Sequence, residues 1–304
     1  MPVESPGRVL VVGDVITDVI CKPEGPLVVG SDRRATIRSR PGGSGANQAV
    51  WLAAFGLEVR FAARVGVADL GTFGSQFSKL GVEPALVGDP DLPSGMIVTI
   101  VDPDGERSFL TDRGANVALC EADLPPSLLD GCQVLVVSGY SLFEPRPRRA
   151  VMGLIAAAVV RHVPVAVDPA SVGFLEEVGP GNFLAWTRGA TTIFANDSEA
   201  LALTGGVSLA ARMVALGATY PRVVIKCGAL GAAMGNAAGI ALSLPAPAVD
   251  VLDTTGAGDA FAAAFIAAEL GGGSPEDCLS RAIAAGADAV LHLGGQPQAI
   301  ATER

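Results

Sequence analysis

Residues 253–261 read Asp-Thr-Thr-Gly-Ala-Gly-Asp-Ala-Phe and stand between a strand-like run, Ala248–Leu252, and an alanine-rich segment, 260–270, with the composition of a helix. Glycines at a helix start let backbone N–H groups approach an anion closely, and the helix dipole adds partial positive charge there. A transferring phosphoryl group needs such a cradle, because its catalysis rests mainly on positioning and charge stabilisation. Asp259, in the same turn, has the position of a general base for an attacking hydroxyl. The structural alternative is that Asp259 only complements the dipole of the first helical turn.

Strand-like and helix-like segments alternate through the rest of the chain. Longer alanine- and leucine-rich segments of helical spacing separate short runs that are rich in valine and isoleucine, namely Val9–Val12, Val134–Val137, Val163–Val167, Thr192–Ala195 and Val223–Ile225. This alternation is typical of β-α-β units and predicts a mostly parallel sheet with helices on both faces. Ser274-Pro-Glu-Asp277 combines an N-cap, a first-turn proline and acidic residues, and predicts a helix from there to about His292.

Two stretches, approximately 16–40 and 95–113, interrupt this alternation and resemble pairs of short strands. In the second, Asp102-Pro-Asp-Gly105 is a turn sequence between two strand-forming runs, which predicts a β-hairpin. The two pairs together predict a small sheet over the C-terminal edge of the main sheet, where α/β folds bind ligands. A length of 304 residues fits either two domains or one large α/β domain. The pattern predicts an α/β fold of three layers, with helices on both faces of the sheet and a small β-sheet lid.

The composition argues against several classes of partner. A formal net charge of −10 disfavours nucleic acids and acidic membrane surfaces, because like charges repel. Five cysteines without a CxxC pair indicate reduced thiols in a cytoplasmic protein, and residues 1–8 lack the features of a signal peptide. The apolar runs are too interrupted by charge and glycine to predict a membrane span.

Candidate acceptor-binding residues lie near the first strand and the foot of the lid. Gly42 and Gly43 begin a glycine-rich cluster that could hinge the lid, and Asn47 could hydrogen-bond ligand hydroxyls; the alternative is a simple loop-to-helix junction. Asp14 and Asp18 follow the first strand, where carboxylates can hold vicinal sugar hydroxyls. Their alternative is turn capping by Asp14 and a solvated Asp18.

Two further strand ends carry candidate nucleotide contacts. Asn196-Asp-Ser-Glu199 either lies near metal-bound phosphate or is an ordinary helix cap. Lys226-Cys-Gly-Ala-Leu-Gly231 ends another strand with a glycine loop, which is either a nucleotide contact or a plain β-turn. Competing phosphate motifs fail: no lysine is followed by Ser or Thr, as a Walker A loop requires, and the Rossmann glycine fingerprint is incomplete.

In this order and spacing, these clusters resemble those of the ribokinase-like (PfkB) family of carbohydrate kinases. Residues 253–261 look like the family's C-terminal signature, and Gly42-Gly-x-Gly-x-Asn47 looks like its N-terminal one. The match runs from about Val9 to Gln298, nearly the whole chain. The resemblance implies a three-layer ribokinase-like fold, an ATP-dependent kinase that uses Mg²⁺, and a lid that excludes water from the sugar.

The resemblance also implies a role for each candidate residue. Asp259 would be the catalytic base, and the anion hole would consist of Gly256, Ala257 and Gly258. The acceptor would contact Asp14, Asp18, Gly42, Gly43 and Asn47. The Mg²⁺ and phosphate side would be formed by Asn196, Glu199, Lys226, Gly228 and Gly231.

Further features of the family map onto this chain with some departures. Members often bind a monovalent cation such as K⁺ beside the anion hole, and Asp253 and Thr255 match that site. In relatives the lid can also form a dimer contact, so we include a homodimer through the lid among the expected partners. Lys226 stands where several relatives have a small polar residue. The lid is rich in arginine, and these side chains are either solvated or directed at an anionic acceptor such as a sugar acid or sugar phosphate: Arg33, Arg34, Arg38, Arg40, Arg107 and Arg113.

Three functions follow as hypotheses. The first is transfer of the γ-phosphoryl group of ATP to a hydroxyl of a small carbohydrate, with Asp259 as base. The second is a nucleoside kinase, for which Phe109 and Tyr140 are the few aromatic candidates to stack on a base. The third is a non-catalytic sugar- or nucleotide-binding protein on the same fold, which the intact Asp259 and glycines disfavour.

Overall fold

Nine strands form the central sheet of the protein, whose computed structural model describes residues 8–102 and 106–298. The neighbouring pairs among seven of the strands are parallel, whereas β12 runs antiparallel to both of its neighbours. From one edge to the other the strands are β13 (Gly239–Leu244), β12 (Ala232–Asn236), β11 (Arg222–Lys226), β10 (Thr192–Asn196), β9 (Val165–Asp168), β8 (Cys132–Ser138), β1 (Arg8–Val12), β4 (Glu58–Gly66) and β5 (Val82–Asp89).

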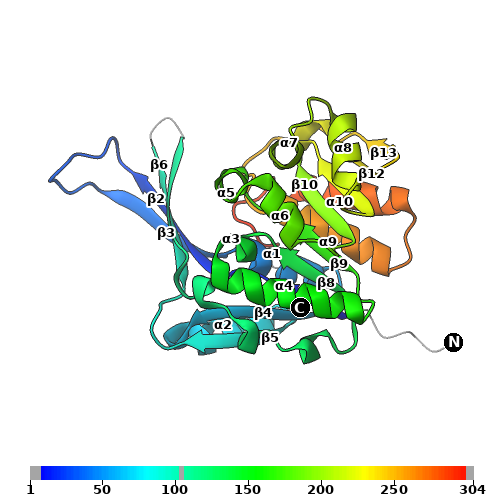
Figure 1. Cartoon of the computed structure of the whole chain (residues 1–304). Helices are drawn as coiled ribbons and strands as arrows, with labels where there is room; N and C mark the ends of the chain where they lie inside the picture. Colours follow the sequence, from blue (N-terminus) through cyan, green and yellow to red (C-terminus); the bar gives the residue numbers. More distant parts are fainter. Residues whose placement is uncertain (1–7, 103–105, 299–304) are drawn as a thin grey trace, which may run out of the picture.

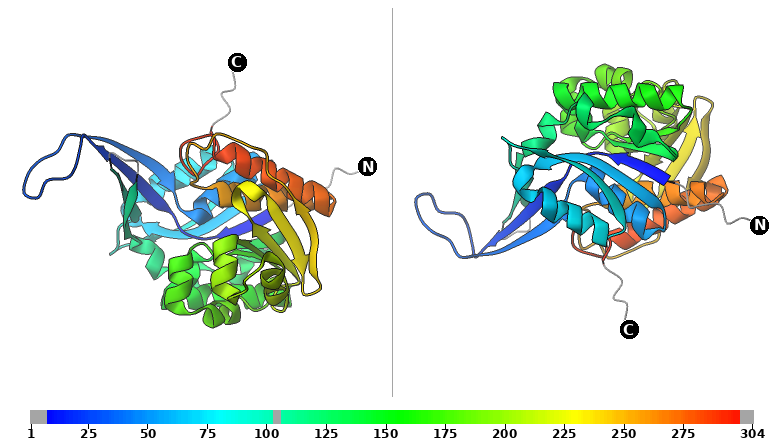
Figure 2. Two further views of the ribbon diagram at one scale, coloured as in Figure 1. Left: turned by 90° about the horizontal axis from the view of Figure 1, so that it is seen from above. Right: turned by 90° about the horizontal axis from the view of Figure 1, so that it is seen from below.

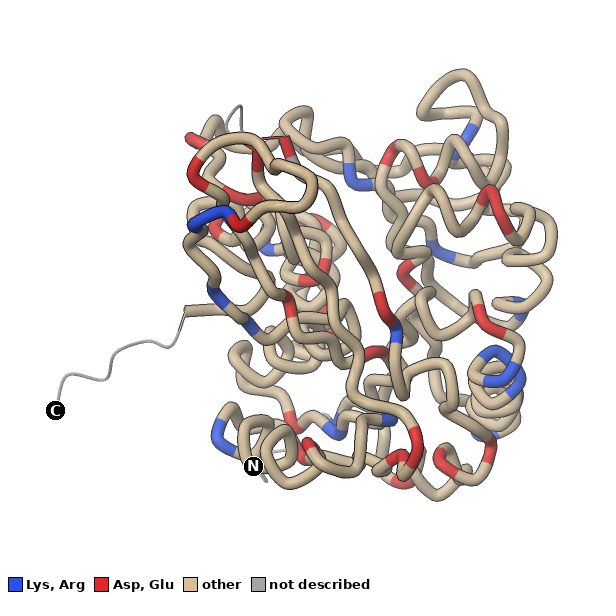
Figure 3. Tube along the Cα trace, turned by 90° about the vertical axis from the view of Figure 1, so that its left-hand side faces the viewer, with Lys and Arg blue, Asp and Glu red and all other residues tan. Residues whose placement is uncertain are grey.

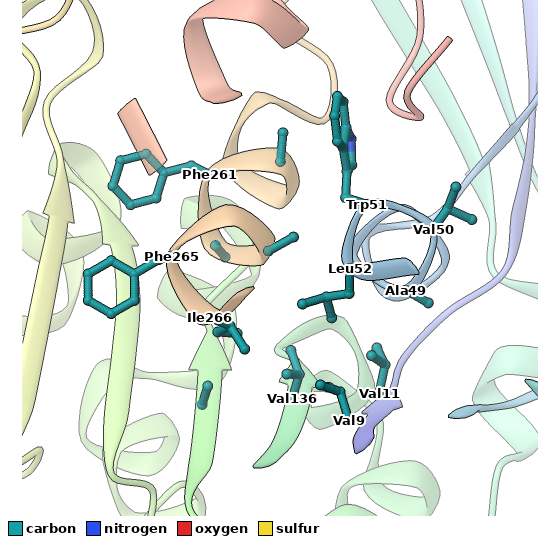
Figure 4. Close-up of a cluster of buried hydrophobic side chains, with 14 of the residues drawn as sticks. Val9, Val11, Ala49, Val50, Trp51, Leu52, Val136, Phe261, Phe265 and Ile266 are labelled. Carbon is teal, nitrogen blue, oxygen red and sulfur yellow. The ribbon is translucent and has the colours of Figure 1, made fainter. Parts of the chain in front are cut away.

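The central strands are buried on both faces, which explains their continuous apolar runs. In β1, Val9 and Val11 face one hydrophobic core while Leu10 and Val12 face the other, and all four side chains are fully buried. Figure 4 shows the first core, where the sheet packs against side chains of two helices. Each fully buried valine or leucine contributes about 1.5–3 kcal/mol to folding, so the sheet centre is the most strongly stabilised part of the fold.

Helices cover both faces of the sheet and make the protein three-layered (Figures 1 and 2). One face packs against α1 (Ser44–Ala54), α2 (Leu70–Lys79), α9 (Ala257–Leu270) and α10 (Pro275–Ala289). The other packs against α3 (Tyr140–Phe143), α4 (Pro145–Val160), α5 (Val172–Val178), α6 (Pro180–Trp186), α7 (Asp197–Thr204) and α8 (Leu209–Gly217).

A second sheet of four strands stands away from the main body (Figure 1). Its order is β3 (Ala35–Gly42), β2 (Ile16–Pro23), β6 (Gly95–Val101) and β7 (Arg107–Asp112), with β2 and β6 parallel and both outer pairs antiparallel. The two strand pairs predicted from the sequence thus join in one sheet, which we call the lid. The turn at residues 103–105 and the side chain of Arg107 lie outside the described part of the structure.

The structure confirms one local prediction, the helix at Ser274, and contradicts another, the strand at Ala248–Leu252. The helix predicted at Ser274 is α10, which begins with a capping box between Ser274 and Asp277 and ends at Ala289. The strand predicted at Ala248–Leu252 is wrong: the segment is irregular, and its valines at 249 and 251 are exposed. Pro245 and Pro247 precede it and lack the N–H groups that a sheet ladder needs.

The cysteines and the apolar helices have the following features in the structure. All five cysteines are free. Within the described ranges, no single helix combines the length and the apolar composition needed to cross a bilayer; α7 and α8 meet these two criteria only when taken together, across a bend of 62°.

Candidate active site

A cavity of about 790 Å³ opens at the carboxyl ends of the parallel strands, between the main sheet and the lid. The chain crosses from β1 to β4 and β5 on one side and continues through β8 to β11 on the other, so strand order reverses between β1 and β8. Such a switch point creates a crevice that α/β folds use to bind ligands. Most of the predicted site residues line this cavity: Asp14, Asp18, Gly43, Asn47, Asn196, Glu199, Lys226, Gly228, Asp253, Thr255, Gly256, Gly258 and Asp259.

Asp259 lies in the first turn of α9 and is held by one face of α1. Its Oδ1 accepts hydrogen bonds from Ser44 Oγ at 2.7 Å and from Gln48 Nε2 at 3.1 Å, and its Oδ2 accepts one from Asn47 Nδ2 at 3.0 Å. The three donors lie on one face because residues three and four apart are neighbours on a helix. The carboxylate is therefore oriented before any ligand binds.

The surroundings of Asp259 raise its pKa to near neutral pH. The carboxyl group is only 9% exposed, and burial followed by the nearby charge of Asp168 raises its pKa to about 7, whereas the hydrogen bonds from α1 oppose this rise. A carboxylate with a pKa close to the working pH is suited to general base catalysis, because it is both available and able to accept a proton. The structure thus gives Asp259 more than the dipole-capping role of the structural alternative.

The start of α1 is pressed against the turn after β1. Gly43 has φ of +95°, and a β-carbon there would lie 2.5 Å from the backbone oxygen of Asp14, so only glycine fits. The Asp14 carboxylate accepts from Gly45 N and Ser138 Oγ, both at 3.3 Å, and is 4% exposed. Asp14 therefore caps the turn, as in its structural alternative, while also lining the cavity.

Asp18 lies at the junction of the lid and the cavity. A β-carbon on Gly42 would come within 2.3 Å of Asp18 Oδ2, which shows how closely this carboxylate packs on the foot of β3. Burial, followed by the charges of Asp14 and Asp253, raises the pKa of Asp18 to about 6. The side chain is thus desolvated rather than freely solvated, contrary to the structural alternative for this residue.

Lys226 ends β11 and forms a buried ion pair across the cavity floor. Its Nζ lies 2.7 Å from Asp168 Oδ2 at the end of β9. Burial alone would lower the pKa of Lys226, but the charges of Asp168 and Glu199 outweigh it, so its pKa is above the ordinary value. A β-carbon on Gly258 would lie 3.0 Å from the same Nζ, which places the ammonium group beside the first turn of α9.

Asn196 and Glu199 form a capping box at the start of α7. Asn196 Oδ1 accepts from Glu199 N and Glu199 Oε2 accepts from Asn196 N, each at 2.8 Å. Burial, followed by the charge of Asp168, raises the pKa of Glu199 to about 7. The capping alternative is therefore present in the structure, and Glu199 also faces the cavity.

The loop before α9 is tied to the segment after α10. Asp253 Oδ1 accepts from Thr255 Oγ1 at 2.7 Å, and its Oδ2 accepts from Gly294 N at 3.0 Å. Gly256 has φ of +75°, and a β-carbon there would lie 2.4 Å from the Cα of Gly295. This close backbone packing explains the glycine that begins α9. The K⁺ site predicted at Asp253 and Thr255 stays a prediction.

Three predicted site residues do not line the cavity. The Ala257 side chain packs against the core, and Gly42 packs against Asp18. Gly231 is a turn residue with φ of +98°, where a β-carbon would meet Leu244 O at 2.0 Å. Its β-turn alternative therefore describes it better than a nucleotide contact.

Ser44, Gln48 and Asp168 contact Asp259 or Lys226 in the structure but are not among the predicted site residues. A signal for the first two was present, because Ser44, Asn47 and Gln48 follow the i, i+3, i+4 spacing of one helix face. Asp168 ends a predicted strand in the same way as Asn196 and Lys226 end theirs. Its place at the carboxyl end of a predicted parallel strand is the sequence signal for Asp168.

The residues at the ends of β9 and β10 fit a magnesium site. Mg²⁺ prefers oxygen ligands and is usually bound through one or two carboxylates, together with waters and substrate phosphates. Asp168, Glu199 and Asn196 supply carboxylate and amide oxygens at this edge, and Asp168 and Glu199 are buried. Burial and then the charge of Asp168 raise the pKa of Glu199, and a divalent cation would neutralise that second contribution.

Two relatives are similar to this chain in sequence over most of its length. An ATP-dependent ribose-1-phosphate kinase from Halopiger xanaduensis is 31% identical over 92% of this chain and 90% of that protein. A bifunctional protein HldE from Shewanella baltica is 31% identical over 94% of this chain, which spans 60% of the length of that relative.

A solved structure and a family model are also similar to this chain over most of its length. A putative ribokinase II from E. coli, solved with ATP and Mg²⁺, superposes with a TM-score of 0.83 at 20% identity, over 95% of this chain and 94% of that one. This likeness confirms the predicted fold class. The family described as pfkB family carbohydrate kinase matches residues 7–302. Since that match covers nearly the whole sequence, the chain belongs to the PfkB family of carbohydrate kinases.

Proposed function

We propose that this protein transfers the γ-phosphoryl group of ATP to a hydroxyl of a small carbohydrate, with Asp259 as general base. The observation that carries this proposal is the oriented, buried Asp259 carboxylate with a pKa of about 7 at the start of α9. The names of the ribose-1-phosphate kinase and of the ATP complex support a carbohydrate acceptor and ATP with Mg²⁺. A single kinase domain over residues 1–304 in the cytoplasm belongs to the same proposal.

The hydrogen bonds of Asp259 indicate where the acceptor hydroxyl would bind. Each carboxylate oxygen has two lone pairs. Oδ1 already accepts from both Ser44 and Gln48, whereas Oδ2 accepts only from Asn47 among the described residues. The acceptor O–H would therefore donate to Oδ2, which takes its proton as the oxygen attacks phosphorus. Asp14 and Asp18 would hold neighbouring hydroxyls from the side of β1 and β2.

The nucleotide would bind on the other side of the same helix start. Backbone N–H groups of Gly256, Ala257 and Gly258 would face the developing charge, with the α9 dipole behind them. The Ala257 N–H would have to share its hydrogen bond with the Thr254 carbonyl, to which it donates at 3.3 Å. The Lys226 ammonium beside Gly258 supplies a fixed positive charge, and Gly228 lines the same side. Bound Mg²⁺, held by Asn196, Glu199 and Asp168, would neutralise charge on the phosphates.

The lid would cover the acceptor and also pair two copies of the chain. Its outer face and the loop between β2 and β3 carry exposed apolar side chains, including Ile37, Met96 and Leu110. Such a patch is typical of protein contacts. We include a homodimer through this face in the proposal, and sedimentation of the purified protein tests it.

An ADP-release assay over pentoses, hexoses, sugar acids and nucleosides tests the function. A thermal-shift screen of the same compounds with a non-hydrolysable ATP analogue reports binding. Turnover of at least one acceptor is expected. Thermal shifts without turnover of any compound would contradict the kinase and favour a binding protein on this fold.

A nucleoside kinase is the second candidate, because aromatic rings line the cavity, among them Phe109, Tyr140 and Phe174. Phe109 on the lid is 61% exposed, and Tyr140 follows β8. An exposed ring in a ligand cavity is suited to stack on a base. Preference for adenosine or inosine over every sugar, and loss of that preference in Phe109→Ala, would establish this alternative.

A further inference from the structure

The lid sorts its side chains onto two faces, and its cations lie on the face that lines the cavity. Successive residues of a strand point to opposite faces, so alternate positions define the cavity side. Lys22 on β2 and Arg38 and Arg40 on β3 hold such positions, and Arg113, just after β7, also lines the cavity. Hydroxyl groups share this face, from Thr36, Thr99 and Thr111.

The opposite face of the lid carries no lysine or arginine among the side chains that the structure describes. Its positions are mainly apolar, as in Val19, Cys21, Ile37, Val98 and Leu110. Over the whole chain acidic residues outnumber basic ones, 31 to 21, and both are spread along the trace (Figure 3). Purely solvated cations would not need to gather on the inner face. Their position indicates a negatively charged ligand.

Three of these cations have no carboxylate partner within residues 8–102 and 106–298. The Arg38 guanidinium donates to the neighbouring Ile37 carbonyl at 3.0 Å, and Lys22 has no ion pair there. The Arg113 guanidinium carbon lies 5.1 Å from the centre of the Tyr140 ring, while its Nε is buried without a hydrogen-bond partner. A buried donor without an acceptor is unfavourable, and a bound anion would satisfy it.

Arg40 lies at the foot of the lid, beside the segment that follows α10. It donates to the Leu293 carbonyl, and its Nη1 lies 3.2 Å from the position of a β-carbon on Gly294. Arg38, two residues along β3, lies about 7 Å farther up the lid, because a strand rises roughly 3.4 Å per residue. An acceptor whose hydroxyl faces Asp259 would thus meet these arginines with a different part of its structure.

We infer that the acceptor is a sugar that already carries a phosphate group, which lies among the cations on the cavity face of the lid and is contacted by Arg113 while a free hydroxyl faces Asp259. This inference rests on the proposed kinase function. Guanidinium groups bind phosphate oxygens through paired N–H donors, and a dianionic phosphate suits several guanidinium groups better than a singly charged carboxylate does. A neutral sugar would leave the clustered cations without a counter-charge.

The triphosphate of ATP is the rival ligand for these cations. The start of α9 and Lys226 at the end of β11 already offer it a cradle on the main sheet. The arginines belong to the lid, where Asp18 on β2 is paired in register with Arg40 on β3. The two ligands are separable by experiment, because each has its own KM.

Steady-state ADP release at saturating Mg-ATP provides the test. The acceptors are ribose and ribose 1-phosphate, fructose and fructose 6-phosphate, and glucose and gluconate. We expect kcat/KM for one phosphorylated sugar to exceed that for its neutral partner roughly tenfold or more, which corresponds to about 1.4 kcal/mol. Arg113→Gln should raise the KM for that acceptor roughly 10- to 100-fold, the loss expected for a charge-assisted hydrogen bond. Arg38→Gln, on the opposite edge strand, should raise it by less, roughly two- to fivefold, the loss expected for a charge without a direct contact. The KM for ATP should stay within about twofold of the parent value, since no ATP contact is lost.

Arg34→Gln is the matched control, because Arg34 lies in the loop between β2 and β3 and does not line the cavity. It should leave both KM values unchanged. A neutral sugar as best acceptor, with Arg38→Gln and Arg113→Gln without effect, would overturn the inference while the kinase function stands. A preference for gluconate over the phosphorylated sugars would overturn the inference by showing that the lid cations bind a carboxylate. A raised KM for ATP in Arg38→Gln or Arg113→Gln would overturn it by showing that these arginines bind the nucleotide. Absence of turnover with every acceptor would instead contradict the proposed function itself.

Discussion

Replacing Asp259 by Asn removes the proposed base while keeping its shape. The amide keeps one acceptor oxygen for Ser44 and gains an NH₂ group that needs an acceptor of its own. Asn47 Oδ1 and Gln48 Oε1 are buried without hydrogen-bond partners in the described structure. Rotation of either amide would present an oxygen to the new NH₂ group. We therefore expect Asp259→Asn to fold like the parent.

The variant should be more stable than the parent above neutral pH. The Asp259 carboxyl has an ordinary pKa of 3.8 and a pKa of about 7 in the folded protein, so the fold favours its neutral form. Between these two values the folded state binds more protons than the unfolded state, and stability falls as pH rises. Above pH 7 the ionised group lowers stability by roughly 4 kcal/mol at most, at about 1.4 kcal/mol per unit.

Asparagine does not ionise, so the difference in stability between the variant and the parent equals the ionisation penalty of Asp259. At pH 8 the melting temperature of Asp259→Asn should exceed that of the parent by up to about 8 °C, at roughly 2 °C per kcal/mol for a chain of this length. At pH 5 only about 1.6 kcal/mol of the penalty is present, so the gain should shrink to roughly 3 °C. Calorimetry at the two pH values measures this difference.

Activity should change in the opposite direction. Loss of a general base lowers kcat roughly 10²- to 10⁴-fold, while titration calorimetry should show ATP binding close to that of the parent. Asp130→Asn is the control, because Asp130 lies on the surface with its side chain 68% exposed. It should alter neither kcat nor the pH dependence of melting. Near-normal turnover of Asp259→Asn would refute its role as base, and a lower melting temperature at pH 8 would refute the burial argument.

The pH dependence of kcat/KM should show a rise to a plateau above about 7 as Asp259 loses its proton. Gln48→Leu removes a donor that lowers this pKa, so the midpoint of the pH–rate profile should move upward. Gly258→Ala would bring a β-carbon within 3.0 Å of Lys226 Nζ and should lower kcat roughly tenfold with an unchanged melting temperature, because only a flexible side-chain end must move. Lys226→Met leaves Asp168 buried without its cation and should cost about 3–5 kcal/mol in urea unfolding at pH 8.

The sequence by itself determined the order of the elements and the start of α9, the helix that carries the proposed base Asp259. Apolar runs such as Val9–Val12 predict buried parallel strands, because such strands must be apolar on both faces. The cap at Ser274 and the glycines before Asp259 predict helix starts, since capping depends on residues within one turn. The apolar residues of Ala248–Leu252 wrongly predicted a strand, because the prediction did not take account of the prolines just upstream.

Only the tertiary structure decided which side chains donate hydrogen bonds to Asp259 and how far its pKa is raised. The donors Ser44 and Gln48 lie more than 200 residues away in the sequence, and Asp168 reaches the site from the end of β9. The pKa of Asp259 depends on burial and on those neighbours, which are properties of three-dimensional packing. The gathering of lid cations on one face likewise follows from strand pairing and register, which bring β2, β3, β6 and β7 together across the chain.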